Sequence, residues 1–344
     1  MRYHFIRVPI AVLTVVLLLG TALPACTPFP EPDYITYTSG LPGARDIAVV
    51  RPDGGHAFIL TDDPQGLSSD NFEPVWDPNR QRIAFLSNRD GNIEVYVGVA
   101  SEDAPVFYRI TNSEFDESQV SWSADGNRIA YTSEDHEGRR TVQHVALNEL
   151  VPTAVVFGSE GETDAAWSPT DNLIVFAKLK ENGESDGIFL RDPSNVNIVQ
   201  LTAGPHHFPT WAPDGKSIAY VSTQNDGQKD IYVINVSALG PTSEPLRVTQ
   251  DGADDYGPSW SRDGSRIAFI SDRSGNADVY TIAPNGGGLV MITQNAVNEL
   301  SVAWGPDGSL VFPSGPEDRT ALFIADADGQ QQLTSGATAT FPDW

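Results

Sequence analysis

The seven tryptophans of this chain recur at a nearly constant interval. The spacings between successive tryptophans are 46, 45, 44, 49, 44 and 40 residues, and the positions are Trp76, Trp122, Trp167, Trp211, Trp260, Trp304 and Trp344. A period of about 40–45 residues with one large aromatic per unit is typical of a β-propeller built from four-stranded blades. A blade cannot bury both of its faces alone, so the tryptophans predict several blades packed side by side.

Each unit contains four apolar segments in a fixed order. In the unit that begins at Trp76 they are Pro74–Trp76, Arg82–Leu86, Ile93–Val97 and Ile110–Thr111. The middle two alternate and are rich in β-branched and aromatic residues, which favours strands. Six complete units of this kind predict six complete blades.

The two ends of the chain hold the parts of one further unit. Tyr34–Tyr37, Ile47–Val50 and Ala57–Leu60 supply a second, third and fourth strand, whereas Thr340–Trp344 supplies a first strand with nothing after it. Pairing these segments removes the open edges that an unclosed array would leave. We therefore predict an all-β propeller of seven four-stranded blades, closed by pairing of the N- and C-terminal strands, with six or eight blades as alternatives.

Turn residues and prolines indicate how each blade is oriented. Ser-x-Asp-Gly sequences such as Ser123–Gly126 join the first two strands, where Asp-Gly closes a tight hairpin, so we assign these turns no chemistry. Proline stands two residues before Trp76, Trp211, Trp260 and Trp344. Because proline within a sheet is confined to edge strands, the Trp strand is predicted to be an edge of its blade.

The N-terminus has the features of an export signal. A basic segment with Arg2 and Arg7 precedes an apolar run, Val8–Leu19, and then Leu23–Cys26. This ending resembles the lipobox of bacterial lipoproteins, in which the cysteine is lipidated and becomes the new N-terminus. We expect a signal peptide at 1–25, lipidation of Cys26, a proline-rich tether at 26–33 and one propeller domain at 34–344. Ordinary cleavage and an uncleaved anchor helix are the alternatives.

The charge balance restricts the possible partners. The chain has 21 Lys and Arg against 46 Asp and Glu, a net charge of −25. Such a protein repels nucleic acid and anionic lipid surfaces and favours cationic partners or divalent metals. We expect a monomer that meets the membrane only through its lipid anchor, on the periplasmic or outer side of a bacterial envelope.

The repeat resembles the TolB-type propeller family. The resemblance covers residues 33 to 344 and rests on the pattern Pro-x-Trp-Ser-x-Asp-Gly-x-x-Ile-Ala-Phe, an Asp-Ile-Tyr strand and a closing Leu-Thr. It implies the propeller fold, with the Trp strand lining the central channel. It says little about function, because functions are grafted onto such scaffolds. TolB itself carries an α/β domain before six blades, so this chain is expected to be a relative and not TolB.

The candidate ligand site lies in the stretches just before the tryptophans. These stretches hold ten carboxylates and neither Lys nor Arg, which predicts a negative channel mouth. The positions five residues before each tryptophan are Asn71, Glu117, Glu162, His206, Asp255, Glu299 and Ala339. Of these, Glu117, Glu162, His206, Asp255 and Glu299 are our candidate ligand-binding residues. A divalent cation such as Ca²⁺ at His206, His207, Asp254 and Asp255 is a further possibility. Alternatively, the acids only bond local backbone or stay solvated.

Two functional classes follow. The first is a lipid-anchored, non-catalytic scaffold that binds an envelope protein or a cationic ligand at the channel mouth, and we favour it because no catalytic motif is present. The second is an enzyme, since propellers of the resembled family include a metal-dependent polysaccharide lyase. An acidic sugar would need Arg or Lys at the mouth, so a hydrolase for neutral sugars or another metal-dependent hydrolase is the form that survives. A third possibility is a purely structural role.

Overall fold

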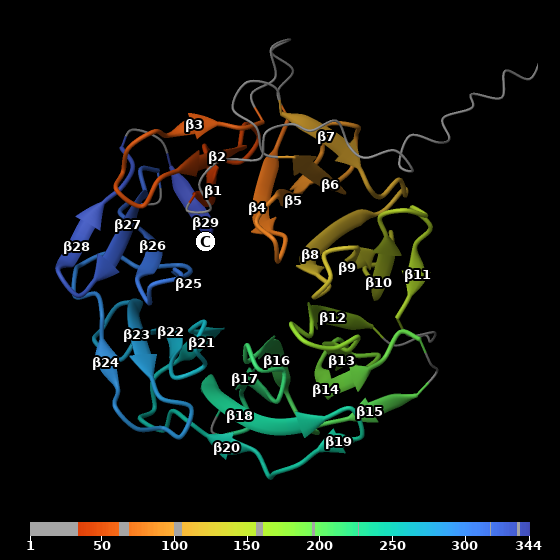
Figure 1. Ribbon diagram of the computed structural model, residues 1–344. Coiled ribbons are helices and arrows are strands. Elements are labelled where there is room, and N and C mark those ends of the chain that lie inside the picture. The colour runs from red at the N-terminus through yellow and green to blue at the C-terminus, as the bar shows by residue number, and fades with distance from the viewer. Residues whose placement is uncertain are drawn as a thin grey trace, which may run out of the picture.

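Seven antiparallel sheets stand around a central channel in the computed structural model (Figure 1). The structure describes residues 34–61, 69–99, 105–155, 161–194, 197–225, 227–316, 318–335 and 338–344. The predicted signal peptide, Cys26 and tether lie outside these ranges. The predicted count of seven blades is confirmed, and the second, third and fourth strands of each blade lie progressively farther from the channel.

The strand that ends at or next to the repeated tryptophan is innermost in every blade, as predicted (Figure 1). These innermost strands are β4 (Asn71–Trp76), β8 (Asp116–Trp122), β12 (Glu162–Trp167), β16 (His206–Trp211), β21 (Asp255–Trp260), β25 (Ala303–Trp304) and β29 (Ala339–Asp343). The second strands are β1 (Ile35–Ser39), β5 (Arg82–Ser87), β9 (Arg128–Glu134), β13 (Ile174–Leu179), β17 (Ser217–Ser222), β22 (Ile267–Ser271) and β26 (Leu310–Ser314).

The third and fourth strands form the outer part of each blade. The third strands are β2 (Asp46–Val50), β6 (Glu94–Val99), β10 (Arg140–Ala146), β14 (Ser185–Arg191), β18 (Asp230–Ser237), β23 (Asp278–Ile282) and β27 (Ala321–Asp326). The fourth strands are β3 (Phe58–Ile59), β7 (Val106–Arg109), β11 (Thr153–Ala154), β15 (Ile198–Gln200), β24 (Val290–Met291), β28 (Gly329–Gln332) and, in the fifth blade, β19 (Gly240–Pro241) together with β20 (Leu246–Arg247).

The core lies between neighbouring blades. Ile83 and Phe85 of β5 pack with Trp76 and with Ile47 and Val49 of the preceding blade. Both faces of a second strand are covered by adjacent blades, so its residues are buried without interruption and its sequence reads as an apolar run. The Ile-Ala-Phe segments are therefore explained by packing from both sides.

Four of the seven tryptophans also donate a hydrogen bond to the preceding blade: Trp122, Trp211, Trp260 and Trp304. Trp122 Nε1 donates a hydrogen bond to the carbonyl oxygen of Val75 at 3.0 Å, and Trp304 Nε1 donates to Ser259 at 2.9 Å. In both cases the acceptor is the residue immediately before the tryptophan of the preceding blade. One large side chain per unit thus supplies apolar area and fixes the spacing of the innermost strands.

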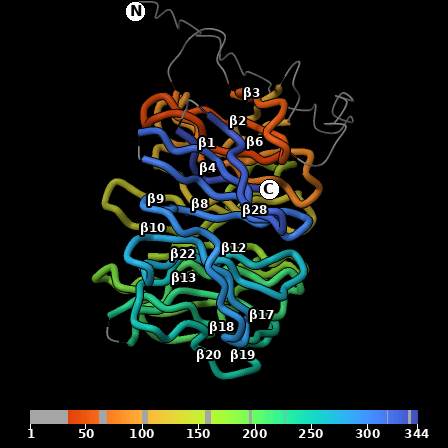
Figure 2. The backbone as a smooth tube through the Cα atoms, turned by 90° about the vertical axis from the view of Figure 1, so that its left-hand side faces the viewer, coloured from red at the N-terminus to blue at the C-terminus, as the bar shows by residue number. Residues whose placement is uncertain are grey.

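The ring closes through the two ends of the chain. β29 pairs with β1, with Thr38 opposite Thr340 and Ser39 opposite Ala339, and Figure 2 shows the C-terminal backbone beside the N-terminal strands. Trp344 packs so closely on the seventh blade that a Cβ on Gly305 would lie 2.3 Å from its ring. Glycine is therefore required at position 305. Closure by strand pairing is confirmed.

Candidate functional site

The residues predicted to form a ring of ligands at the channel mouth lie inside the protein. Each of the five is at most 2% exposed: Glu117, Glu162, His206, Asp255 and Glu299. They begin or nearly begin the innermost strands, where the chain leaves the outer strand of one blade and enters the next. Ligand binding by these residues stays a prediction, and their burial argues against it.

Hydrogen bonds within the protein occupy these side chains. Asp255 accepts a bond from Arg273 at 2.7 Å, and Glu299 accepts bonds from Thr293 at 2.9 Å and Ser314 at 2.8 Å. Glu162 accepts from the backbone N–H of Val142 at 3.2 Å. These positions thus bond nearby side chains as well as backbone, whereas the alternative considered above was bonding to local backbone alone.

The backbone at these positions is bonded to the preceding blade. The N–H of Asp255 donates to the carbonyl of Lys229 at 2.8 Å, and that of Glu299 donates to Ala277 at 2.8 Å. The closing threonine of the preceding blade lies beside the same junction, because the Thr293 hydroxyl accepts from the N–H of Val279 at 2.8 Å. Acid and threonine lie together at this inter-blade junction, and an acid stands at four of the seven equivalent positions: Glu117, Glu162, Asp255 and Glu299.

Burial perturbs the ionisation of the junction acids. Burial raises the pKa of Glu117 to about 7; the hydroxyls of Ser113 and Ser133 oppose the rise, and Glu94 and Asp116 add to it. Burial likewise raises the pKa of Asp255 and of Glu299, against the hydrogen bonds that each receives. The junctions are thus a source of pH-dependent stability.

The four residues considered for a metal are not brought together. His206 is 2% exposed, with Nε2 at 3.1 Å from the carbonyl of Ala203, whereas Asp254 accepts the N–H of Lys229 at 3.0 Å. Within the described ranges no group of three or more His, Cys, Asp or Glu side chains is placed to hold a metal ion. The divalent cation stays an untested prediction.

A different position of the same strands reaches the channel. Three residues before the tryptophan the chain forms a β-bulge, with the register shift in β4 falling between Phe72 and Val75. The residue there takes the left-handed conformation, which L-residues adopt at a cost: φ is 52° at Glu73, 56° at Gln119, 57° at Asp164, 53° at Phe208 and 48° at Phe341. We call these five the bulge residues.

Two of the bulge residues expose aromatic rings. Phe208 is 54% exposed and Phe341 is 42% exposed, although both belong to innermost strands. The faces of an innermost strand are covered by neighbouring blades and its outer side by the second strand, so an exposed side chain there opens onto the channel. The channel therefore presents apolar surface.

Polar groups lie between these rings. Asp164 accepts bonds from Gln119 Nε2 at 2.6 Å and from the N–H of Phe208 at 3.2 Å, and its Oδ2 lies 3.5 Å from Nδ1 of His207. This chain of contacts joins three consecutive blades. Burial raises the pKa of the bulge residue Glu73, with Arg45 opposing. The channel wall thus combines aromatic, carboxylate and imidazole groups.

The end of the channel beyond the tryptophans carries charges of both signs, from Asp77, Arg80, Arg262 and Asp343. A hollow of about 420 Å³ is lined there by Trp76, Pro213, Arg262 and Trp344, among others, from blades on opposite sides of the ring. Arg262 donates to the carbonyl oxygen of Trp344 at 2.6 Å, and Arg80 donates to Tyr34 at 2.7 Å. These arginines follow the tryptophans in sequence and so fall outside the stretches on which the negative mouth was predicted. That prediction gains no support, because most of its carboxylates are bonded inside the protein.

The bulge residues were missed at the sequence level. Their signal is a constant offset from the tryptophan, but the residue types at this offset vary, from glutamate and glutamine to phenylalanine and, in the sixth blade, Gly257. Variable residue types at one position are compatible with a channel surface. The acids five residues before the tryptophan were predicted as ligands because they repeat, but here the repeated residues have a structural role.

The fold is a β-propeller, and the side chains that its innermost strands direct into the channel differ from blade to blade. The sequence model of the TolB beta propeller domain (PD40) matches residues 26–226 and 197–344. The chain therefore belongs to the TolB-type propeller family.

The named relatives and solved structures belong to different classes of protein. The chain is 26% identical over 249 residues to Dipeptidyl-peptidase 5 of Porphyromonas gingivalis, which covers 57% of this chain and 36% of that protein. The solved structure of TolB from Acinetobacter baumannii has a TM-score of 0.58 at 19% identity, covering 91% of this chain and 66% of the other. An oligogalacturonate lyase in complex with manganese has a TM-score of 0.69 at 14% identity, covering 85% of each chain. At these identities the structures show the fold alone. The chain spans less than two thirds of the first curated relatives it matches.

None of the described residues forms a helix of the length and apolarity needed to cross a membrane.

Proposed function

We propose that this protein is an exported propeller of the bacterial envelope that binds a protein partner through its channel, without catalysis. The observation that carries the proposal is the exposure of Phe208 and Phe341 on innermost strands, at 54% and 42%. Exposed aromatic side chains in a concave surface are typical binding anchors. The strained φ of both residues agrees with a functional role, since such strain concentrates at binding sites.

The partner's chemistry follows from the channel wall. Apolar anchors on the partner would contact Phe208 and Phe341, and a basic or hydrogen-bonding group would meet Glu73, since Asp164 is buried and bonded within the wall. The protein has a net charge of −25, which favours a cationic segment and disfavours acidic ones. TolB of Acinetobacter baumannii has the same fold. The sequence match to the Tol-Pal system protein TolB of Alcanivorax borkumensis supports an envelope location for this chain.

Site-specific photocrosslinking in cells tests this function. A photoreactive phenylalanine analogue in place of Phe208 or Phe341 should give a defined adduct with an envelope protein. The matched control is Leu239, which is 93% exposed in the turn between β18 and β19, on the outer rim of the ring (Figure 1). Absence of any adduct from both channel positions, or the same adducts from position 239, would refute channel binding.

Membrane anchoring through Cys26 is a separate part of the proposal. The Leu-x-Ala-Cys ending of the export signal supports it. A Cys26→Ser variant should lose palmitate labelling and leave the membrane fraction, while its crosslinks at Phe208 should persist in vitro. Labelling that survives this substitution would disprove the anchor and leave channel binding untouched.

An enzyme that works in the same channel is the second candidate. It is favoured by His207, whose Nδ1 lies 3.5 Å from Asp164 Oδ2, an arrangement that orients an imidazole for proton transfer. The match to Dipeptidyl-peptidase 5 also supports a hydrolytic activity, although the match covers 36% of that protein. Hydrolysis of a peptide or neutral-sugar panel that His207→Gln abolishes, or bound metal in elemental analysis of the purified protein, would favour this candidate over the scaffold.

A further inference from the structure

The bulge residues of consecutive blades are linked along the channel wall. Gln119 Oε1 accepts the N–H of Asp164 at 2.9 Å, and Asp164 Oδ2 accepts the N–H of Phe208 at 3.2 Å. In both links the side chain of one bulge residue bonds the backbone of the bulge residue in the next blade, where β8, β12 and β16 follow one another around the channel (Figure 1). A bulge leaves one residue of its strand unpaired, so these side chains supply acceptors that the ladder does not.

This series of links ends at Phe208. The next innermost strand, β21, has its bulge between Tyr256 and Ser259, and Gly257 stands three residues before the tryptophan. A phenyl ring has no oxygen that could accept the N–H of Gly257. Among the described residues, neither a side chain nor a loop carbonyl accepts this N–H. The backbone donor of Gly257 therefore lacks the partner that its counterparts have.

The space in front of Gly257 is open, and we call it the Gly257 gap. A Cβ at this position would have no heavy atom within 4 Å, chain neighbours excepted, and the φ of 64° is close to that of the bulge residues. Phe208, in the adjacent strand β16, is 54% exposed. An exposed ring, an open space and a backbone donor thus occur in consecutive blades at one level of the channel.

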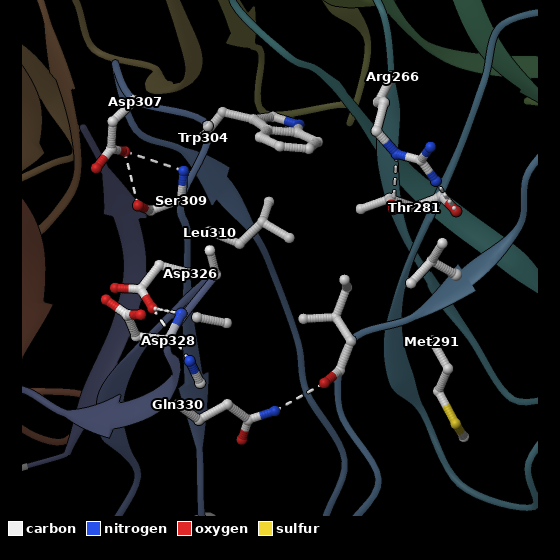
Figure 3. A pocket seen from close by; sticks show the side chains of 16 residues that line it. Arg266, Thr281, Met291, Trp304, Asp307, Ser309, Leu310, Asp326, Asp328 and Gln330 are labelled. Atoms are coloured by element: carbon white, nitrogen blue, oxygen red, sulfur yellow. Dashed lines mark hydrogen bonds between the residues drawn. The ribbon is translucent and has the colours of Figure 1, made fainter.

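A hollow of about 710 Å³ between the sixth and seventh blades offers no such surface (Figure 3). Its one aromatic residue, Trp304, is 9% exposed, and the neighbouring Leu310 is 3% exposed. An aromatic ligand in that hollow would therefore find no exposed ring to stack on. The channel wall at Phe208 is the better place for one.

We propose that the Gly257 gap seats an aromatic side chain of the channel partner, stacked on Phe208, while a backbone carbonyl of the same segment accepts the N–H of Gly257. This role depends on the channel binding proposed above, and it names the residue class that the partner inserts. Aromatic pairs contribute more than their apolar area alone, which favours a ring over an aliphatic side chain. A neutral carbonyl suits the donor better than a carboxylate, because the protein has a net charge of −25.

Fluorescence anisotropy of the full chain with a labelled peptide, Gly-Lys-Ser-Phe-Ser-Lys-Gly, tests the gap. A second peptide carries cyclohexylalanine, a saturated residue of similar size, in place of Phe. Gly257→Phe fills the gap, and the bulge accepts phenylalanine because Phe208 and Phe341 adopt φ values of 53° and 48° there. The matched control is Gly183→Phe, since Gly183 has a φ of 81° and open space around it in the turn between β13 and β14, away from the channel.

The Phe peptide should bind the parent about three- to tenfold more tightly than the cyclohexylalanine peptide. Gly257→Phe should weaken binding of the Phe peptide by about tenfold or more, and Gly183→Phe should leave it unchanged. Phe208→Leu, which keeps an apolar side chain, should remove the preference between the peptides and carries the test if Gly257→Phe does not fold. Equal binding of the two peptides by the parent, or a preference that survives in Phe208→Leu, overturns the proposal.

A measurement in cells separates this proposal from channel binding as such. The photoreactive analogue at Phe341 should lose its adduct with the envelope protein in the Gly257→Phe background and keep it in the Gly183→Phe background. An adduct that persists in Gly257→Phe would overturn the gap as the seat and leave channel binding standing. Absence of the adduct in the parent would refute channel binding, and the seat with it.

Discussion

Glu117 offers the most direct test of the inter-blade junctions. It is 2% exposed, and burial raises its pKa from 4.5 to about 7. A rise of this size corresponds to about 3 kcal/mol between the two protonation states. Because the pKa in the folded protein is above that of the unfolded chain, the neutral carboxyl contributes stability below pH 4.5, and this contribution is lost as the pH rises through 7.

Glu117→Gln removes the ionisation and keeps an oxygen that can accept the Ser113 hydroxyl, which now donates at 2.8 Å. We expect the variant to be more stable than the parent by about 1–3 kcal/mol at pH 8 and to differ little at pH 4.5. Urea unfolding followed by tryptophan fluorescence at both pH values measures the difference. A stability change that is the same at both pH values would refute the reasoning.

Glu299→Gln is the matched control for this substitution. Glu299 also sits five residues before a tryptophan, but Oε1 accepts from Asn295 and Ser314, at 2.7 Å and 2.8 Å, and Oε2 accepts from Thr293 at 2.9 Å. An amide offers one acceptor oxygen in place of two, so a donor loses its partner. Burial also raises the pKa of Glu299, so glutamine removes a cost at pH 8 here as well, and the lost bond offsets it. We therefore expect Glu299→Gln to be less favourable than Glu117→Gln at pH 8 by about 1 kcal/mol. An equal gain in both variants would show that the lost bond has no effect.

Three further predictions concern stability. Arg273→Ala should cost about 3–5 kcal/mol in urea unfolding, because it strands the buried Asp255, whereas Arg319→Ala, whose 3.9 Å ion pair is exposed, should cost less than about 0.5 kcal/mol. Phe208→Gly should be more stable than Phe208→Ala by about 1 kcal/mol, since glycine accepts the φ of 53°, and equal stabilities would contradict the strain. Deletion of residues 339–344 should lower the midpoint of thermal unfolding measured by circular dichroism, by removing β29 and Trp344, and an unchanged midpoint would mean that the ring does not depend on closure.

The fold was accessible from the sequence because its repeat has a physical cause at each position. Tryptophans such as Trp122 and Trp304 recur because each is buried where two blades meet, and Ile83–Phe85 reads as an apolar run because both faces of its strand are covered. The unpaired first strand at Thr340–Trp344 likewise identified the closing blade before any geometry was known.

The candidate site was harder to predict from the sequence, because the residues that repeat are the ones with a structural role. The acids that stood out by repeating, such as Asp255 and Glu299, are repeated because they bond the junctions, and their burial depends on how neighbouring blades meet. Phe208 and Phe341 reach the channel only because a β-bulge turns them outward, and nothing in their residue type marks a bulge.

Closure between β1 and β29 also sets an order of events in the cell. Thr38 and Thr340 are neighbours in the first sheet, although almost the whole chain separates them. β29 is synthesised after every other strand of the ring, so the first blade lacks its innermost strand until then, and its apolar residues stay without their final cover. In the exported protein proposed above, the ring would therefore close only after this last strand had crossed the membrane.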